Sequence, residues 1–415
     1  MSRQMAAVDE QLAVLLRGTE FGDPQTRRVM ASELRERLKE DRPLRVYCGY
    51  DPTAVDLTLG HTLTMRKLRQ FQDLGHDVTF LVGTFTALAG GDPSDKDRHR
   101  PMLSAEQVRT NAETYLHQAF RILDRERTTV RENVEWLADL RFEEVLRLCS
   151  HFTVAQFLER ENFQRRWERR DPIHLSELLY AILQAYDAVS LETDVQVGGS
   201  EQLFNLMAGR TLQREFGQRP QVVLTVPILV GTDGRLKMSK TTGNYIGVDE
   251  PPADIYGKVM SIPDSAIGDY FTLLTPLTAE EVAAILGRVR AGELPAMEAK
   301  KRLAHAIVAS LHPERAADEA QSYFEATIQR GETPSAMPEH ALGGAPPQAR
   351  ALHRVLVASG LAASSAEAKR LVSQGAVAVN GERVAETTRP LAPGDELRVG
   401  RHRFLRVVAG TERDR

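Results

Sequence analysis

The chain has very little cysteine and no long apolar run. Among its 415 residues the only cysteines are Cys48 and Cys149, so neither a disulfide framework nor a cysteine-based zinc site can be built. No stretch of about eighteen consecutive apolar residues occurs, which argues against a membrane-spanning helix. The first ten residues mix acidic and basic side chains and lack the basic start and apolar core of an export signal. We therefore expect an untargeted, cytoplasmic protein with no role in a membrane.

The composition is that of a globular protein with an uneven charge distribution. Apolar residues make up 42% and charged residues 27% of the sequence. A chain of 415 residues is too long for one ordinary core, because domains usually hold about 100 to 200 residues. The net charge of −4 divides into +4 for residues 351–415 and −8 for residues 1–350. A basic end indicates either a contact with a polyanion or a merely solvated surface.

The first half of the chain alternates apolar strands with helices. Two charged helices between residues 8 and 42 form a lead-in, and the second ends ahead of Pro43. Beyond them we predict strands at 45–50 and 77–83, a helix at 60–74, several long helices between 105 and 210, and a buried strand at 222–230. This order predicts an α/β fold built on a Rossmann-like, doubly wound parallel sheet, whose ligands bind at the carboxyl ends of the strands.

The second half is predicted to be helical and then mixed. Helices are expected at 279–290 and 298–330, the latter broken at Pro313. Residues 331–350 are so rich in proline and glycine that we expect a linker without secondary structure. The final elements are predicted to be helices at 352–359 and 365–373, the latter capped by Ser364, a hairpin at 377–384 turning at Asn380-Gly381, and a hairpin around Gly400.

These elements predict six parts of the chain. They are a helical lead-in (1–43), a catalytic Rossmann-like domain with a helical insertion (44–245), a helical domain (246–330), the linker (331–350), a small α+β domain (351–408) and a tail (409–415).

A Gly-His pair opens the first helix of the α/β region, in the segment Thr58-Leu59-Gly60-His61. The backbone N–H groups and the positive end of a helix attract phosphate groups at such a place. Thr53 and His61 add a hydroxyl and an imidazole that can donate hydrogen bonds as charge builds during displacement at an α-phosphorus. The alternative is a tight strand-to-helix turn that carries a surface histidine.

A basic motif far downstream, Lys237-Met238-Ser239-Lys240, lies between Gly234 and Gly243. The flanking glycines and the two ammonium groups indicate a hinged clamp for phosphates, whereas an exposed basic loop is the alternative. When the attacking group is a substrate carboxylate, it is already ionised. Such a site then needs positioning and charge stabilisation, and no protein nucleophile or general base.

Three polar residues lie on one face of an otherwise apolar helical segment. Tyr180, Gln184 and Asp187 are spaced i, i+4 and i+7, so their side chains point the same way. Polar groups at such positions need partners. Either they satisfy one another where two helices pack, or they bind a polar ligand.

In this order the two motifs resemble the HIGH and KMSKS signatures of the class I aminoacyl-tRNA synthetases. The segments 180–187 (YAILQAYD) and 196–202 (QVGGSEQ) are similar to the substrate-binding segments of bacterial tyrosyl-tRNA synthetases. Residues 352–408 resemble an S4 RNA-binding fold. The resemblance implies an enzyme that activates L-tyrosine with ATP, with Mg²⁺ accompanying the nucleotide, and transfers the tyrosyl group to tRNA(Tyr). It implies no protein-bound metal or prosthetic group.

The resemblance also implies a role for each matching residue. In the amino-acid site, Tyr47 and Asp187 bind the phenolic hydroxyl, Tyr180, Gln184 and Asp92 bind the α-amino group, and Gln202 orients the carboxylate. The residues expected to bind ATP are Cys48, Gly49, Thr58, Gly60, His61, Gly199, Glu201, Met238 and Lys240. Those expected to act in catalysis are Thr53, His61, Lys237 and Lys240.

The sequence departs from the family pattern at three places. Thr58 stands where the family normally has a histidine, and a threonine brings no imidazolium charge to the leaving pyrophosphate. Glu201 stands where aspartate is usual. The segment before Asp92 is one residue longer than usual, so either the loop bulges at Gly90 and Gly91 or Asp92 is displaced.

The expected partners follow from the same resemblance. Lys369, Arg370 and Arg383 are expected to contact tRNA phosphates, and the helical domain is expected to be of the anticodon-binding type. Family members are homodimers, and we expect the interface among the helices between Ala105 and Arg170. Two other functions stay open: a tryptophan-specific relative, and a non-aminoacylating RNA-binding paralogue in which Thr58 and Glu201 reflect decay.

Overall fold

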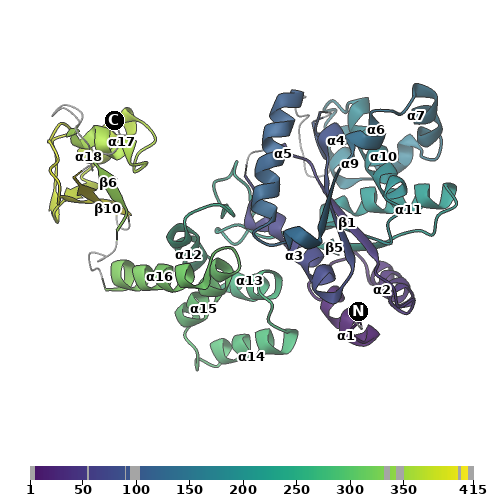
Figure 1. Cartoon of the computed structure of the whole chain (residues 1–415), viewed down its shortest axis with the longest axis horizontal. Helices are drawn as coiled ribbons and strands as arrows, with labels where there is room; N and C mark the ends of the chain where they lie inside the picture. The colour runs from purple at the N-terminus through teal and green to yellow at the C-terminus, as the bar shows by residue number, and fades with distance from the viewer. Residues whose placement is uncertain are drawn as a thin grey trace. The chain divides into compact units, whose positions relative to one another are not determined.

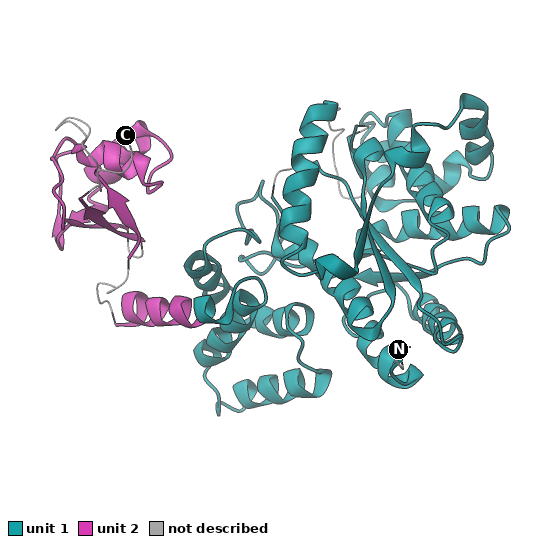
Figure 2. Ribbon diagram, in the orientation of Figure 1, with its two compact units in different colours: residues 1–317 teal, residues 318–415 magenta. Residues whose placement is uncertain are grey.

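The structure is a computed structural model that describes residues 5–53, 56–88, 90–93, 103–330, 337–342, 350–400 and 403–409. It divides into two compact units, residues 1–317 and 318–415 (Figure 2). The division falls inside helix α16 (Glu314–Phe324), and the six parts predicted above remain a prediction.

The first unit is built on a parallel sheet. Its five strands lie in the order β3-β2-β1-β4-β5, and every neighbouring pair is parallel. The order reverses between β1 and β4, so a crevice is expected at the carboxyl ends of these two strands. The prediction of a doubly wound, Rossmann-like sheet is confirmed. The strands are β1 (Arg45–Tyr50), β2 (Asp77–Val82), β3 (Thr128–Glu132), β4 (Val195–Gly199) and β5 (Val222–Val226).

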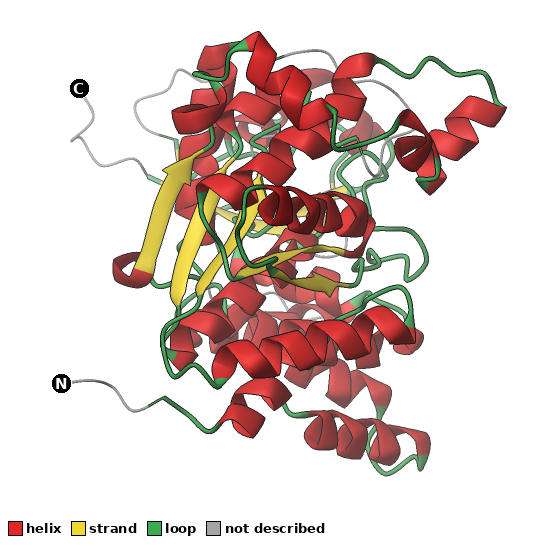
Figure 3. Ribbon diagram, turned by 90° about the vertical axis from the view of Figure 1, so that its right-hand side faces the viewer, coloured by secondary structure: helices red, strands yellow, loops and turns green. Residues whose placement is uncertain are grey.

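Helices cover both faces of this sheet (Figures 1 and 3). They include α3, whose capping residue is Thr58 and whose end is Gly75 in the left-handed conformation. The helices up to the last strand are α1 (Val8–Leu16), α2 (Pro24–Leu38), α3 (Leu59–Leu74), α4 (Thr84–Leu88), α5 (Ala105–Ala119), α6 (Val134–Leu137), α7 (Phe142–Cys149), α8 (Val154–Leu158), α9 (Glu161–Glu168), α10 (Leu175–Ser190) and α11 (Leu203–Glu215).

Two strands lie where only long helices were predicted. β3 and β4 both fall between residues 105 and 210, and several helices there are short, so that prediction is wrong in part. β4 ends in two glycines and β3 is a polar edge strand, so neither shows the apolar run of a buried parallel strand. The predicted strand at 222–230 ends instead at Val226, because Pro227 has no N–H to continue the ladder.

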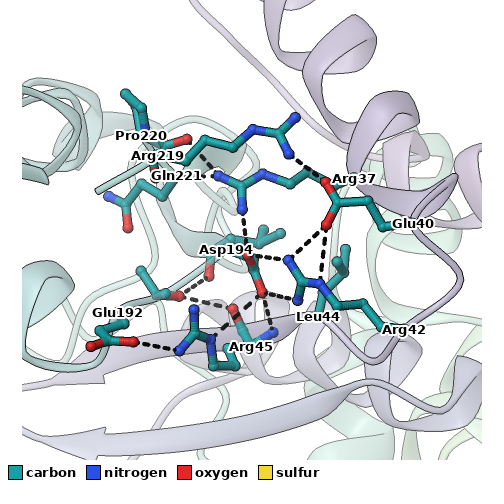
Figure 4. Close-up of polar contacts among 12 residues, drawn as sticks. Arg37, Glu40, Arg42, Leu44, Arg45, Glu192, Asp194, Arg219, Pro220 and Gln221 are labelled. Atoms are coloured by element: carbon teal, nitrogen blue, oxygen red, sulfur yellow. Dashed lines mark hydrogen bonds and ion pairs between the residues drawn. The ribbon is translucent and has the colours of Figure 1, made fainter. Parts of the chain in front are cut away.

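A buried ion cluster holds the amino ends of the sheet (Figure 4). Asp194, directly before β4, is 1% exposed and pairs with the guanidinium of Arg37 from α2. It also accepts hydrogen bonds from Arg42 at 2.7 and 2.9 Å and from the backbone N–H of Arg45 at 2.9 Å. Burial raises the pKa of Asp194, but these hydrogen bonds and charges outweigh it and leave the pKa below its usual value. The cluster joins α2, β1 and β4 at the edge opposite the carboxyl ends.

The helical part that follows the sheet contains α12 (Pro252–Met260), α13 (Ile267–Leu274), α14 (Ala279–Arg290) and α15 (Ala296–Ala309), and continues into α16. The predicted helix at 279–290 is confirmed. The predicted break at Pro313 is also confirmed, because α15 ends before it and α16 begins after it.

The second unit begins with the end of α16 and a π-helical turn at Glu325–Gln329. It then contains a mixed sheet in the order β6-β10-β9-β7-β8 and the helices α17 (Leu352–Ala358) and α18 (Ser365–Ser373). The hairpin of β7 (Val377–Val379) and β8 (Glu382–Arg383) turns at Asn380 and Gly381, both with positive φ, as an Asn-Gly turn requires. The hairpin of β9 (Glu396–Val399) and β10 (Arg403–Val408) is also confirmed. The expectation of a linker without secondary structure is wrong at β6 (Glu339–Ala341), which pairs with β10 and gains its stability from that partner.

Candidate active site

A buried phenol with no hydrogen-bond partner in the described part of the chain lies on β1, one of the two strands between which the strand order reverses. Tyr47 lies on β1, is 1% exposed, and its hydroxyl has no hydrogen-bond partner among the described residues. Its ring packs on Leu81 and on Ala188 of α10. Burial and the nearby charge of Asp187 raise the pKa of Tyr47, so the hydroxyl is neutral. An unpaired buried hydroxyl costs free energy, and a polar ligand group placed here recovers it.

Asp187 supplies the matching carboxylate. It lies on α10, is buried, and accepts hydrogen bonds from Trp136 Nε1 at 2.8 Å and Asn133 Nδ2 at 3.5 Å. Burial raises the pKa of Asp187 well above its usual value, and these hydrogen bonds oppose the rise. The two donors hold the carboxylate in one orientation and leave further lone pairs for a ligand.

A second group of polar side chains surrounds Asp51, the residue directly after β1. Asp51 accepts hydrogen bonds from Tyr180 OH at 2.6 Å, Thr86 Oγ1 at 2.6 Å and the backbone N–H of Asp92 at 3.0 Å. Burial raises the pKa of Asp51 to about 6, although the hydrogen bonds from Thr86 and Tyr180 act in the other direction. A Cβ at Gly83 would overlap the Asp51 carboxylate, so a glycine is needed at the end of β2.

The paired glycines before Asp92 both have a left-handed backbone conformation. Gly90 and Gly91 both have positive φ, at 96° and 72°. This conformation places Asp92 within reach of Asp51 and of Asn205, whose Nδ2 lies 3.3 Å from Asp92 Oδ1. The same amide nitrogen donates to Gln184 Oε1 at 3.0 Å. Tyr180, Gln184 and Asp92 are therefore brought together around Asp51 and Asn205.

The segment that opens α3 fixes the orientation of one histidine. The backbone N–H of Thr58 donates to His61 Nδ1 at 3.1 Å, and Thr58 Oγ1 lies 2.9 Å from the same nitrogen. Because a backbone N–H is always a donor, Nδ1 is an acceptor and the neutral imidazole carries its hydrogen on Nε2. Thr58 is buried and His61 is exposed, so the Nε2–H group can donate on the open side.

The two distant motifs are neighbours in the structure. A Cβ at Gly60 would lie 4.0 Å from the Cβ atoms of Leu229 and Met238, so Gly60 sits against the lysine motif. Backbone hydrogen bonds of 2.9 Å from Leu59 to Ile246 and 3.0 Å from Val248 to Leu57 join the same segments. Phosphates at the start of α3 would therefore lie beside the lysines.

Each lysine of the motif pairs with a carboxylate. Lys240 Nζ donates to Asp56 at 2.8 Å, two residues before Thr58, and Lys237 Nζ lies 3.4 Å from Glu201. All four side chains are partly exposed, so these pairs contribute little to stability. Glu201 thus faces the lysine motif, and its longer side chain reaches it.

The remaining predicted residues line the same carboxyl edge. Gly199 ends β4, and Gln202 lies in the 3-10 turn that follows, beside Gly198. Cys48 is buried on β1 with its pKa raised to about 12 by burial, so it is an unreactive thiol. Gly49 follows it on the same strand. Thr53 packs against Gly91.

Four residues at this edge were missed by the sequence analysis. Asp51, Asn133, Trp136 and Asn205 hold the predicted residues in place. Asp51 directly follows a predicted strand, and a polar residue at the carboxyl end of a parallel strand is a candidate for ligand binding. Its position in the sequence could therefore have identified it. Asn133 and Trp136 follow β3, which was not predicted, so no signal pointed to them.

The predicted RNA-binding residues lie in the second unit. Lys369 and Arg370 are on α18 and Arg383 is on β8, and all three are exposed. In the described part of the chain, no group of three or more His, Cys, Asp or Glu side chains is placed to hold a metal ion. Likewise, no helix among the described residues has the length and apolar character needed to cross a bilayer.

A parallel sheet in this order, with polar side chains gathered near the carboxyl ends of β1 and β4, defines a doubly wound α/β protein. Residues 39–329 match the family described as tRNA synthetases class I (W and Y), and residues 352–397 match the S4 domain. The chain belongs to this family of class I tRNA synthetases and carries an S4 domain.

Individual relatives agree with this assignment. The chain is 47% identical to a tyrosine–tRNA ligase of Oleidesulfovibrio alaskensis over 97% of this chain and 99% of that protein. It is 45% identical to a tyrosine–tRNA ligase of Thermotoga maritima over 92% and 94%. A crystal structure of tyrosyl-tRNA synthetase complexed with L-tyrosine from Archaeoglobus fulgidus has the same fold, with a TM-score of 0.60, 22% identity, and coverage of 76% of this chain and 100% of that one.

Proposed function

We propose that this protein is a tyrosine–tRNA ligase. It uses ATP to convert L-tyrosine into tyrosyl adenylate and pyrophosphate, and then transfers the tyrosyl group to the terminal adenosine of tRNA(Tyr). The observation that carries the amino-acid assignment is the buried hydroxyl of Tyr47, which has no partner in the described chain and lies in the field of Asp187.

Selectivity for tyrosine follows from this pair. The substrate hydroxyl donates to the carboxylate of Asp187 and accepts from Tyr47, so both groups are satisfied in the complex. Phenylalanine fills the same space but leaves both buried groups unpaired, and sites of this kind therefore reject it. Trp136 and Asn133 keep the Asp187 carboxylate aimed at the substrate.

The ammonium group of the substrate binds among Asp51, Asp92, Tyr180 and Gln184. Two of these four groups are carboxylates, which complement a positive charge. Asn205 holds Gln184 and Asp92, and Tyr180 is held by Asp51. Gln202 lies in the 3-10 turn that follows β4, and it orients the carboxylate of the substrate.

Activation is an in-line displacement. A carboxylate oxygen of tyrosine attacks the α-phosphorus of ATP, the new C–O–P bond forms, and the bond to pyrophosphate breaks. The Nε2–H of His61 and the hydroxyl of Thr53 donate to phosphate oxygens, and Lys237 and Lys240 neutralise the leaving pyrophosphate. Mg²⁺ enters with ATP as part of the co-substrate.

The nucleotide binds where three glycines, at 49, 60 and 199, let it approach the backbone. The side chains expected beside it are those of Cys48, Thr58, Glu201 and Met238.

The S4 domain and the helical part before it bind tRNA(Tyr). Lys369, Arg370 and Arg383 are exposed cations in one small domain, and they contact phosphates without reading bases. The enzyme works in the cytoplasm, where tyrosine, ATP and tRNA are available together.

An apolar surface supports a homodimer. Five large apolar side chains on α7, α8, α9 and α10 are 54 to 77% exposed. Exposed apolar side chains that gather on one part of a surface mark a site of interaction with another protein. Of these helices, α7, α9 and α10 lie at one end of the first unit in Figure 1, and α8 contacts α9. The residues are Phe142, Leu146, Val154, Trp167 and Leu175. All but Leu175 lie inside the region where the interface was expected.

The test is tyrosine-dependent exchange of pyrophosphate into ATP, with phenylalanine and tryptophan as controls. We expect exchange with tyrosine and with neither phenylalanine nor tryptophan. We also expect the Asp187→Ala variant to lose this exchange. Exchange with tryptophan would favour a tryptophan-specific relative. No exchange, together with intact tRNA binding, would favour the non-aminoacylating RNA-binding paralogue.

A further inference from the structure

The loop that carries the two lysines has a defined main-chain structure. Val230 and Lys237 form an isolated antiparallel bridge, the N–H of Gly231 donates to Leu236 O at 2.8 Å, and the N–H of Met238 donates to Leu229 O at 2.9 Å. These bonds shape only the first half of the loop. The second half, up to Asn244, has turn bonds of its own, from the N–H of Gly243 to Lys240 O and from Thr242 Oγ1 to Ser239 O, both at 3.1 Å. Neither of these bonds reaches residues 236–238.

Asn244 is a buried residue whose side-chain amide reaches both halves of the loop. It is 5% exposed. Its Oδ1 accepts from the N–H of Ser239 at 2.9 Å and from Thr242 Oγ1 at 2.6 Å. Its Nδ2 lies 3.3 Å from Leu236 O and 3.2 Å from Lys237 O. One amide therefore bonds to the backbone on both sides of Met238, inside the lysine motif itself.

Two further residues contact this amide, one by a hydrogen bond and one by leaving space for it. Asp233 accepts from Asn244 Nδ2 at 2.7 Å and also from the N–H groups of Arg235 and Leu236 at 2.8 and 3.0 Å. A Cβ at Gly231 would overlap the amide group of Asn244, so only glycine leaves room for it. The φ of Gly231 is not in the left-handed region, so the requirement at this position is space alone.

We propose that Asn244 is a positioning residue for the activation step. With Asp233 and the space at Gly231, it holds the backbone of residues 236–239 so that Lys237 and Lys240 are presented to the leaving pyrophosphate. This inference rests on the proposed function. A residue that only stabilised the fold would affect tyrosine binding and phosphate chemistry alike. Among the described residues, the side-chain hydrogen bonds of Asn244 all end on residues 233–242 of the lysine loop.

The variants separate the contacts of the amide. Asn244→Asp keeps the shape but replaces the donor Nδ2 by an oxygen that faces Asp233 and two carbonyl oxygens. Asn244→Ala removes all the contacts, and Gly231→Ala displaces the amide without changing it. Thr242→Val is the matched control, because it removes the hydroxyl contacts to Asn244 Oδ1 and to Ser239 O and leaves the other contacts of the amide.

The readouts are pyrophosphate exchange, tyrosine affinity in the absence of ATP, and trypsin cleavage after Lys237 and Lys240 mapped by mass spectrometry. We expect exchange kcat to fall about 10- to 100-fold and the KM for ATP to rise in the first three variants. The tyrosine Kd should change by less than about twofold, and cleavage should be about tenfold faster, because the loop loses its protection. Thr242→Val should stay within about threefold of the parent chain.

The double variant Gly231→Ala/Asn244→Ala adds a coupling test. A Cβ at position 231 would also lie 2.5 Å from the main-chain oxygen of Asn244, which the alanine variant keeps. If the two substitutions act mainly through the amide, the loss in the double variant is therefore clearly smaller than the sum of the two single losses, and additive losses would contradict this. Unchanged exchange and cleavage, or an equal loss of tyrosine affinity, would overturn the inference. Cleavage needs no activity, so absence of exchange in the parent chain would count against the proposed function while cleavage still decides the role of Asn244.

Discussion

Tyr180 donates its phenolic hydrogen to Asp51 at 2.6 Å, across the gap between α10 and the end of β1. This bond joins a residue that the sequence pattern singled out to one that it did not. It also places a buried carboxyl, with its pKa raised to about 6, beside the expected position of the substrate ammonium group.

The pKa of Asp51 predicts a pH dependence of tyrosine binding. A bound ammonium group favours the ionised carboxylate, so binding releases a proton from any protonated Asp51. The affinity for tyrosine should therefore be constant above about pH 6 and fall as the pH drops through 6. Tyrosine Kd measured by calorimetry from pH 5 to 8 checks this. In Asp51→Asn the affinity should be low throughout, and the step at pH 6 should vanish; a step that persists would assign it to another group.

Removing the hydroxyl of Tyr47 should weaken the preference for tyrosine over phenylalanine without lowering the free energy of unfolding. Tyr47→Phe loses one hydrogen bond to the substrate, about 1 to 3 kcal/mol of tyrosine binding, and narrows the preference over phenylalanine. The folded protein should be no less stable, because the hydroxyl has no partner in the described chain. Exchange kinetics with both amino acids and a urea titration measure the two effects. A large loss of stability would mean that the hydroxyl is already satisfied.

Thr58 should act through His61. Thr58→Val keeps the size of the side chain but removes the hydroxyl contact to Nδ1, so the imidazole is held only by the backbone. We expect kcat of exchange to fall by about tenfold, which is about 1.4 kcal/mol, with tyrosine affinity unchanged. Thr58→Ser should retain most of the activity. Equal activity of the valine and serine variants would show that the hydroxyl has no such role.

The ion cluster at the opposite edge should control stability without touching chemistry. Asp194→Ala leaves buried Arg37 without its partner and should lower the free energy of unfolding by about 3 to 5 kcal/mol. The exposed pair of Glu192 with Arg45 provides the control, since Glu192→Gln should cost about 1 kcal/mol or less. Because the pKa of Asp194 is lowered on folding, its contribution is present above its unfolded pKa near 4 and is lost as the pH falls further. Urea unfolding at several pH values measures both.

The apolar surface should determine the oligomeric state. Replacing Trp167 and Leu175 by aspartate places charges on the proposed interface, where desolvation opposes association. Sedimentation velocity should show a dimer for the parent chain and a monomer for the double variant. A monomeric parent chain would contradict the proposed homodimer interface and would indicate that this surface binds a different protein.

Local patterns were sufficient where an element is stabilised by its own residues. The periodicity of 45–50 and 279–290 and the Asn-Gly turn at 380–381 predicted elements that the structure contains. β3, β4 and β6 were missed because each is stabilised by neighbouring strands and lacks a strong apolar signal of its own. Missing β3 also concealed Asn133 and Trp136, although the residues that they hold had been recognised.

The order of residue types along the chain by itself indicated the fold class, the two motifs proposed to bind phosphate and the polar face of α10, because short-range spacing decides which side chains share a turn or a helix face. Only the tertiary structure decided that Gly60 lies against Met238, that the backbone N–H of Asp92 donates to Asp51, and that Thr58 orients His61. These contacts depend on segments far apart in the sequence, whose approach is set by the packing of the whole sheet and not by any local preference.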